Sequence, residues 1–181
     1  MALRRDAVKP WNKTSVMFVH GVGEQSKGYS EKLIELLAMQ DPDWGAATRW
    51  YELEYDSVNV AMAEKCRGCW DAVKTLPGGT VAESHISDLL NFFLVKDARE
   101  WVDTLFRFEL GTIIKAGQVS KPPVHQPRHR IFIVAHSLGT FVTYEGLHGI
   151  VGETATFGVL KGLVVRGYLT MGSPLGFIRR T

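Results

Sequence analysis

One short stretch limits the fold of this chain more than any other: residues 130–142, with the sequence RIFIVAHSLGTFV. Its apolar run at 131–135 has the length and the β-branched content of a buried strand, and the segment HSLG follows at once, at 136–139. The residues after Ser137 predict a helix over about 138–148. A buried strand that passes directly into a helix is typical of a parallel α/β sheet.

Three further segments predict strands, at 15–21 (SVMFVHG), 48–55 (TRWYELEY) and about 162–171 (GLVVRGYLTM). Strands that alternate with helices predict the α/β class, with a mostly parallel sheet, right-handed crossovers and helices on both faces. The first and third of the four strands are apolar along their length, which is typical of strands covered on both faces.

Two regions between these strands predict helices. The first begins after Ser30, a typical N-cap residue, and Glu31 suits a helix start. Its apolar face is made by Leu33, Ile34, Leu36 and Leu37, and Pro42 lies just beyond its end. The second, about 58–118, is a helical insertion interrupted by LPGGT at 76–80. We favour packing of this insertion on a sheet face, and the alternative is a lid over an apolar pocket.

The composition indicates a single globular domain, residues 1–181, with 45% hydrophobic and 22% charged residues. The net charge is only +2 and no long basic stripe occurs, so nucleic acid is not an expected partner. The chain has no run near the ~20 apolar residues of a membrane span and no apolar signal core, so we expect no transmembrane segment and a cytoplasmic protein. Cys66 and Cys69 lack a second pair, and prolines keep His125 and His129 off a helix, so no metal site is expected.

Small and polar residues follow three of the predicted strands. These segments are HGVG at 20–23, HSLG at 136–139 and GSP at 172–174. Because the carboxyl ends of parallel strands meet at one edge of a sheet, we expect the three segments to lie together. Ala135 and Gly139 are small enough for a tight strand-to-helix turn, which would lift the side chain between them into the open.

Together these segments resemble the α/β-hydrolase superfamily, in its lipase- and esterase-like branch. AHSLG is similar to the nucleophile elbow, HGVGEQ is similar to the oxyanion loop after the first core strand, and LTMGSP is similar to a later core strand. The matches occur in the expected order over about residues 15–177. The resemblance implies a serine hydrolase that acts on small-molecule esters or acyl groups through an acyl-enzyme, without a cofactor.

The resemblance also implies roles for individual residues. Ser137 would be the nucleophile, and the backbone N–H groups of Val22 and Leu138 would form the oxyanion hole. The remaining positions would shape the loop and the elbow, namely His20, Gly21, Gly23, His136 and Gly139.

The superfamily places an acid and then a histidine after the serine. The only later histidine is His148, and the predicted helix would put it roughly 16 Å from Ser137, beyond the reach of a base. Glu145 and Glu153 do not follow a later strand. The resemblance also implies a sheet order with residues 48–55 at one edge and residues 163–171 at the other, and the second of these segments is too apolar for a free edge. We therefore expect a missing C-terminal segment, or else a partner chain, to complete the sheet; a third explanation is a chain that has lost its base.

Other functions remain as alternatives. An acyltransferase would use the same serine, and a non-catalytic α/β-hydrolase-like binding module would keep the fold without turnover. A dinucleotide site is suggested by Gly21 and Gly23 after a strand, but the third glycine of that motif falls on Ser26. The nearby Asp41 and Asp43 lie in a predicted turn, which makes this alternative the least favoured.

Overall fold

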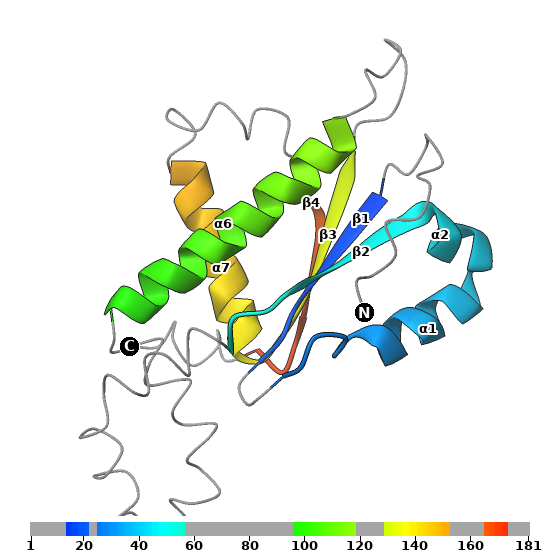
Figure 1. The fold of residues 1–181 in the computed structure, drawn as a ribbon, viewed down its shortest axis with the longest axis horizontal. Helices are drawn as coiled ribbons and strands as arrows, with labels where there is room; N and C mark the ends of the chain where they lie inside the picture. The colour runs from blue at the N-terminus through cyan, green and yellow to red at the C-terminus, as the bar shows by residue number, and fades with distance from the viewer. Residues whose placement is uncertain (1–13, 22–24, 57–95, 119–128, 153–164, 174–181) are drawn as a thin grey trace, which may run out of the picture.

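The computed structural model describes residues 14–21, 25–56, 96–118, 129–152 and 165–173. These residues form a four-stranded sheet in which every neighbouring pair is parallel. Its strands are β1 (Thr14–Val19), β2 (Thr48–Leu53), β3 (Arg130–His136) and β4 (Val165–Met171). The order across the sheet is β2-β1-β3-β4, so the segments near 48–55 and 163–171 form its two edges, which is the order that the resemblance implied (Figure 1).

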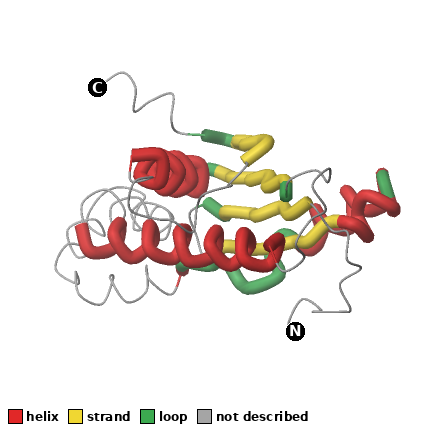
Figure 2. Tube along the Cα trace, turned by 90° about the horizontal axis from the view of Figure 1, so that it is seen from above, coloured by secondary structure: helices red, strands yellow, loops and turns green. Residues whose placement is uncertain are grey.

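Helices lie on both faces of this sheet, which confirms the α/β class predicted from the alternation of strands and helices. Helices α1 (Glu31–Gln40) and α2 (Pro42–Ala47) connect β1 to β2 on one face. Helices α6 (Lys96–Gln118) and α7 (Leu138–Gly152) lie on the other (Figures 1 and 2). Helix α7 is longer than predicted, and α2 was not predicted: Pro42 occupies its first turn, and the Asp41 side chain caps it by accepting from Trp44 N at 2.9 Å.

The hydrophobic core lies between the sheet and the pair α6 and α7. Alternate residues of the strands face the two helices. The helices contribute apolar residues that are three and four positions apart. Among the fully or nearly fully buried members are Met17, Val19, Leu53, Phe106, Leu110, Ile113, Ile131, Ile133, Ala135, Leu138 and Val142. The described part of the insertion, α6, therefore packs on a sheet face, which is the favoured interpretation for that part.

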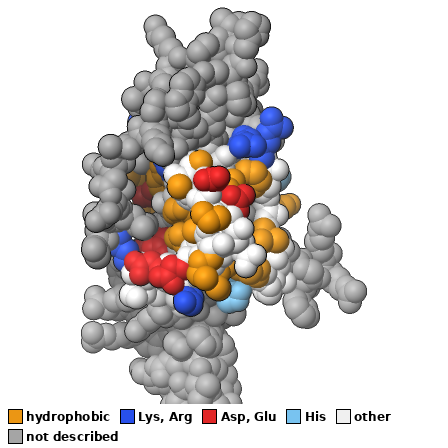
Figure 3. Space-filling view, turned by 90° about the vertical axis from the view of Figure 1, so that its right-hand side faces the viewer, with side chains coloured by type: hydrophobic (Ala, Val, Ile, Leu, Met, Phe, Trp, Pro, Cys, Tyr) orange, Lys and Arg blue, Asp and Glu red, His pale blue; other side chains and the backbone are white. Residues whose placement is uncertain are grey.

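Helix α1 begins where it was predicted, but its apolar face is not buried. None of its residues is buried, and Leu36 and Met39 are 49% and 75% exposed. The helix packs on α2, where Gly45 sits so close to Ala38 that a Cβ on it would be 2.7 Å from Ala38 Cβ. Figure 3 shows the hydrophobic side chains that remain at the surface on this side of the molecule.

The loop before α1 is held by the sheet rather than by an N-cap bond. Ser30 occupies the N-cap position, but its side chain makes no capping bond. Its hydroxyl donates to Glu52 Oε1 at 2.5 Å, and its N–H donates to the same oxygen at 2.7 Å. Gly28 N donates to the other oxygen, Glu52 Oε2, at 2.7 Å. A single carboxylate on β2 thus binds two backbone N–H groups and one hydroxyl of the turn that leads into α1.

The prediction that both inner strands are covered on two faces holds for β1 and is wrong for β3. All six residues of β1 are buried. In β3 only alternate residues are buried, and Phe132 and Val134 on the other face are partly exposed. On that face, Trp44 of the short α2 packs on Trp50 of β2, two strands away from β3 in the sheet.

Among the described helices, none is both long and apolar enough to cross a membrane. Residues 57–95, with Cys66, Cys69 and the greater part of the predicted insertion and lid, lie outside the described residues.

Candidate active site

Ser137 is the single residue that connects a strand to a helix. Strand β3 ends at His136 and helix α7 begins at Leu138. Ser137 has a φ of 50°, and it is the only residue other than glycine with a positive φ in the described ranges. Such a conformation costs roughly 1–2 kcal/mol in a residue with a Cβ, so the surrounding structure has to impose it.

Contacts on both sides of Ser137 impose this conformation. Its N–H donates to the Met171 carbonyl of β4 at 2.8 Å. Its carbonyl accepts from the N–H of Thr140 at 3.0 Å and from the Thr140 hydroxyl at 2.7 Å. These bonds hold the backbone of Ser137 on both sides, at the point where β3 meets the first turn of α7.

The end of β4 is tied to the same turn of α7. The Thr140 hydroxyl lies 2.9 Å from Ser173 Oγ, just after Gly172, which has a φ of 57°. The Tyr168 hydroxyl donates to the Thr140 carbonyl, and burial raises the pKa of Tyr168 to about 12. The HSLG segment and the residues that follow β4 therefore lie side by side, as predicted.

Two glycines allow the end of β1 to approach the elbow. A Cβ on Gly139 would be 2.2 Å from the His20 carbonyl and 2.5 Å from the Val19 carbonyl. A Cβ on Gly21 would be 2.7 Å from Ser137 Cβ. Real Cβ contacts do not reach these distances, so the backbone of β1 lies directly against the first turn of α7 at these positions.

His136 lies beside the elbow at the surface. It is exposed, and its Nδ1 would be 3.0 Å from a Cβ on Gly21. Its Nε2 would be 3.7 Å from a Cβ on Gly172. The imidazole thus stands close to the ends of both β1 and β4, which agrees with its expected place beside the elbow.

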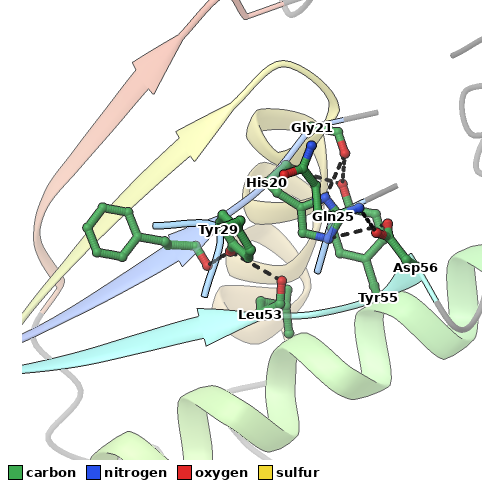
Figure 4. A network of polar contacts seen from close by, with 8 residues as sticks. His20, Gly21, Gln25, Tyr29, Leu53, Tyr55 and Asp56 are labelled. Atoms are coloured by element: carbon green, nitrogen blue, oxygen red, sulfur yellow. Dashed lines mark hydrogen bonds and ion pairs between the residues drawn. The ribbon is translucent and has the colours of Figure 1, made fainter. Parts of the chain in front are cut away.

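A buried polar network lies below the loop that follows β1 (Figure 4). His20 is 4% exposed, and its Nδ1 donates to the Gly21 carbonyl at 2.8 Å. The ring stacks on Tyr55, with centroids 4.1 Å apart and planes 10° from parallel. The Tyr55 hydroxyl donates to the carbonyls of His20 and Gly21, at 2.8 and 3.1 Å. The resemblance implied a structural role in this loop for His20, whereas Tyr55 was missed.

Asp56 and Tyr29 complete this network. Asp56 Oδ1 is 3.5 Å from His20 Nε2, and Asp56 Oδ2 accepts from Gln25 N. The edge of the Tyr29 ring meets His20 at a centroid distance of 5.2 Å, and its hydroxyl donates to the Phe18 carbonyl at 2.7 Å. Burial, followed by the nearby charge of Glu52, raises the pKa of Tyr29 well above its usual range.

The predicted oxyanion donors are only partly described. Leu138 is buried at the first position of α7, so its N–H has no partner within its own helix. Val22 and Gly23, which supply the other expected donor and a loop glycine, lie outside the described residues. The residue directly after Ser137 therefore supplies one backbone N–H, that of Leu138, at the N-terminus of α7.

No histidine in the described ranges makes a hydrogen bond to Ser137 Oγ. His20 is engaged below the loop, and His136 stands beside the elbow. At the opposite end of the sheet, His129 Nε2 is hydrogen-bonded to Ser15 Oγ at 2.9 Å. His148 stacks on Tyr144 far along α7, where it lines an open pocket of about 230 Å³ between α6 and α7.

The described residues contain no group of three or more histidine, cysteine, aspartate or glutamate side chains placed to hold a metal ion. No protein family, curated protein or solved structure matches this chain. The arrangement of its own residues is thus the basis for inferring what the chain does.

Proposed function

We propose that this chain is a serine hydrolase of the α/β-hydrolase type that acts on carboxylic esters, with Ser137 as the nucleophile. The observation that carries the proposal is the positive φ of Ser137 between β3 and α7, at the carboxyl edge of a parallel sheet. An ordinary serine at a strand–helix junction has no need of this strained conformation. A nucleophile does, because the turn presents its hydroxyl to a substrate while its backbone stays bonded.

The chemistry follows from this position. Ser137 Oγ attacks the ester carbonyl and its proton passes to a base, so that the carbonyl oxygen becomes an oxyanion. The N–H of Leu138, at the positive end of α7, and the N–H of Val22 are the proposed oxyanion donors. One such donor is typically worth about 3 kcal/mol of transition-state stabilisation. Loss of the alcohol leaves an acyl-enzyme, which water then hydrolyses.

The proposal requires a base within about 3 Å of Ser137 Oγ, or one water away. None of the described histidines makes a hydrogen bond to Ser137 Oγ. The base would come from residues beyond those described, or from a second chain that completes the sheet beside β4. The exposed Leu169 and Met171 on β4, at 58% and 39%, favour further coverage of this edge.

Two alternatives use the same fold. A non-catalytic binding module is favoured by one observation, the lack of a described hydrogen-bond partner for Ser137 Oγ. An acyltransferase would form the same acyl-enzyme and pass the acyl group to an acceptor other than water.

The test is reaction of the folded chain with a fluorophosphonate, read by intact mass. Ser137→Ala should lose the label, and Ser26→Ala, which changes an exposed serine before α1, should keep it. Hydrolysis of p-nitrophenyl acetate and butyrate, measured on the same three chains, separates ester turnover from simple labelling. A folded wild-type chain that neither reacts nor turns over either ester would favour the binding module instead.

A further inference from the structure

The Thr140 hydroxyl lies between the elbow and the residues that follow β4. It donates to the Ser137 carbonyl at 2.7 Å, beside the Thr140 N–H, which donates to the same carbonyl at 3.0 Å. Its oxygen also lies 2.9 Å from Ser173 Oγ. The Thr140 carbonyl accepts from the Tyr168 hydroxyl of β4. Because Thr140 is fully buried, water does not readily replace any of these partners.

The direction of the hydrogen bonds at the Thr140 hydroxyl follows from the number of protons. A hydroxyl carries one proton, and a carbonyl oxygen only accepts. Since the Thr140 proton is used on the Ser137 carbonyl, Ser173 must be the donor to Thr140 Oγ1. The two bonds therefore run in one direction, from Ser173 through Thr140 to the backbone of Ser137, and the first polarises the second.

The backbone after β4 brings Ser173 to this position. Gly172 directly precedes Ser173 and has a φ of 57°, a conformation that glycine adopts without a Cβ clash. One residue earlier, the Met171 carbonyl accepts from the Ser137 N–H at 2.8 Å. The described part of the third strand-end segment, Gly172 and Ser173, thus contributes a side chain that holds the elbow.

The Ser137 carbonyl also fixes the N–H of the next residue. A trans peptide group is planar and holds its C=O and its N–H on opposite sides. Because the Ser137 carbonyl is directed at Thr140, the N–H of Leu138 is directed away from Thr140. The Leu138 N–H makes no hydrogen bond to any residue that the structure describes. Thr140 therefore holds the peptide group that joins the nucleophile candidate to a free backbone donor.

We propose that Thr140 and Ser173 are positioning residues for the nucleophile elbow. They hold the peptide group between Ser137 and Leu138, so that the Leu138 N–H stays free for an oxyanion that forms at Ser137. This inference rests on the proposed hydrolase function. It adds two hydroxyl groups that act through the backbone of the elbow rather than on the substrate.

The first test measures reactivity of the full chain. Thr140→Val keeps the branched shape of the side chain and removes the hydroxyl. We expect the rate constant for fluorophosphonate labelling, and kcat for p-nitrophenyl acetate, to fall at least about 10-fold, with KM changed by less than about twofold. Thr104→Val is the matched control, because the Thr104 hydroxyl also donates to a backbone carbonyl, that of Glu100 in α6, at 2.7 Å. This control should change none of the three values.

Rescue and a second variant separate positioning from packing. Thr140→Ser loses a methyl group but keeps the hydroxyl, so it should retain most of the wild-type rate. Ser173→Ala removes the donor to Thr140 from a partly exposed position, and we expect both rates to fall at least about twofold. Thermal melts identify a variant that fails to fold. Should Thr140→Val be such a variant, Ser173→Ala and Thr140→Ser carry the test.

The second test is independent of activity. The dipeptide Ser–Leu occurs once in the sequence, at 137–138. A chain made by cell-free synthesis with carbonyl-¹³C serine and ¹⁵N leucine therefore gives one NMR signal that links the Ser137 carbonyl to the Leu138 N–H. Thr140→Val should shift this signal, because the carbonyl loses a donor, and Thr140→Ser should bring it back towards its wild-type position. Thr104→Val should leave it in place.

The outcomes separate the two proposals. An unshifted 137–138 signal in Thr140→Val overturns the inference, and so does a shifted signal with unchanged labelling and turnover. Equal losses of rate in Thr140→Val and Thr140→Ser also overturn it, because the hydroxyl would then have no role. A folded wild-type chain that reacts with neither probe nor ester overturns the proposed function and, with it, the role of the two hydroxyls in catalysis. In that case the 137–138 signal still shows whether Thr140 holds the Ser137 carbonyl.

Discussion

Gly21 lies against the nucleophile candidate so closely that a Cβ on Gly21 would be 2.7 Å from Ser137 Cβ. Its next neighbours would be His136 Nδ1 at 3.0 Å and the His136 carbonyl at 3.1 Å. We predict that Gly21→Ala displaces the elbow, destabilises the chain by about 1–3 kcal/mol and lowers fluorophosphonate labelling of Ser137 at least about 10-fold. Urea denaturation and intact mass measure the two effects.

Gly111→Ala is the matched control for this substitution. Gly111 lies inside α6, and a Cβ there would meet nothing within 4 Å. Alanine in a helix interior is more favourable than glycine by about 0.5–1 kcal/mol, so this variant should be more stable than the wild type. A Gly21→Ala chain that matches Gly111→Ala in stability and labelling would contradict the close approach.

Gly139→Ala should be the most damaging of the glycine substitutions. Its Cβ would be 2.2 Å from the His20 carbonyl and 2.5 Å from the Val19 carbonyl, and these backbone atoms cannot turn aside as a flexible side chain can. The start of α7 would have to move away from β1. We expect a loss of at least about 3 kcal/mol in the free energy of unfolding, measured by urea denaturation. A loss below that of Gly21→Ala would show that α7 can shift freely.

The strained backbone of Ser137 gives a prediction that does not depend on activity. Alanine at this position keeps the penalty of a positive φ, whereas glycine adopts that conformation without a Cβ clash. Ser137→Gly should therefore be more stable than Ser137→Ala by about 1 kcal/mol. Thermal and urea unfolding of the two variants measure the difference. Equal stabilities, or a less stable glycine variant, would mean that the turn is not strained.

The alternation of strands and helices and the tight turn at Ser137 were predictable from local sequence, whereas the order of the strands was implied only by the resemblance. The apolar run at 131–135 and the small Gly139 are visible in the chain, and parallel pairing then brings the strand ends together. The partial exposure of Phe132 and Val134 was not predictable in the same way. Hydrophobicity shows that a strand can be covered on two faces, but not whether a helix lies over each face.

Tyr55 and Asp56 were missed for a related reason. In the sequence Tyr55 is the last residue of the predicted alternating strand and Asp56 follows it, and neither belongs to a motif. Their partners are Gly21 and Gln25, more than 30 positions earlier, and only the pairing of β1 with β2 brings them together. A tyrosine and an aspartate at the carboxyl end of a strand next to the HGVG segment is the signal that sequence reasoning could have used.

The Ser15–His129 pair at the other end of the sheet predicts a loss of stability in acid. Burial, followed by the positive charge of Arg49, lowers the pKa of His129 below its usual value of 6.5. As the pH falls through 6.5, the unfolded chain therefore takes up a proton that the folded chain resists. This contribution to stability is present above pH 6.5 and is lost as the pH falls towards the lowered pKa of the folded state.

His129→Gln isolates this effect, because glutamine can still bond Ser15 Oγ but does not titrate. The free energy of unfolding is measured by urea denaturation at intervals between pH 8 and pH 5 for both chains. The wild type should lose more stability than His129→Gln over this range, since every other titrating group is common to the two. Parallel curves would show that His129 is protonated as easily in the folded chain as in the unfolded one, contrary to its position beside Arg49.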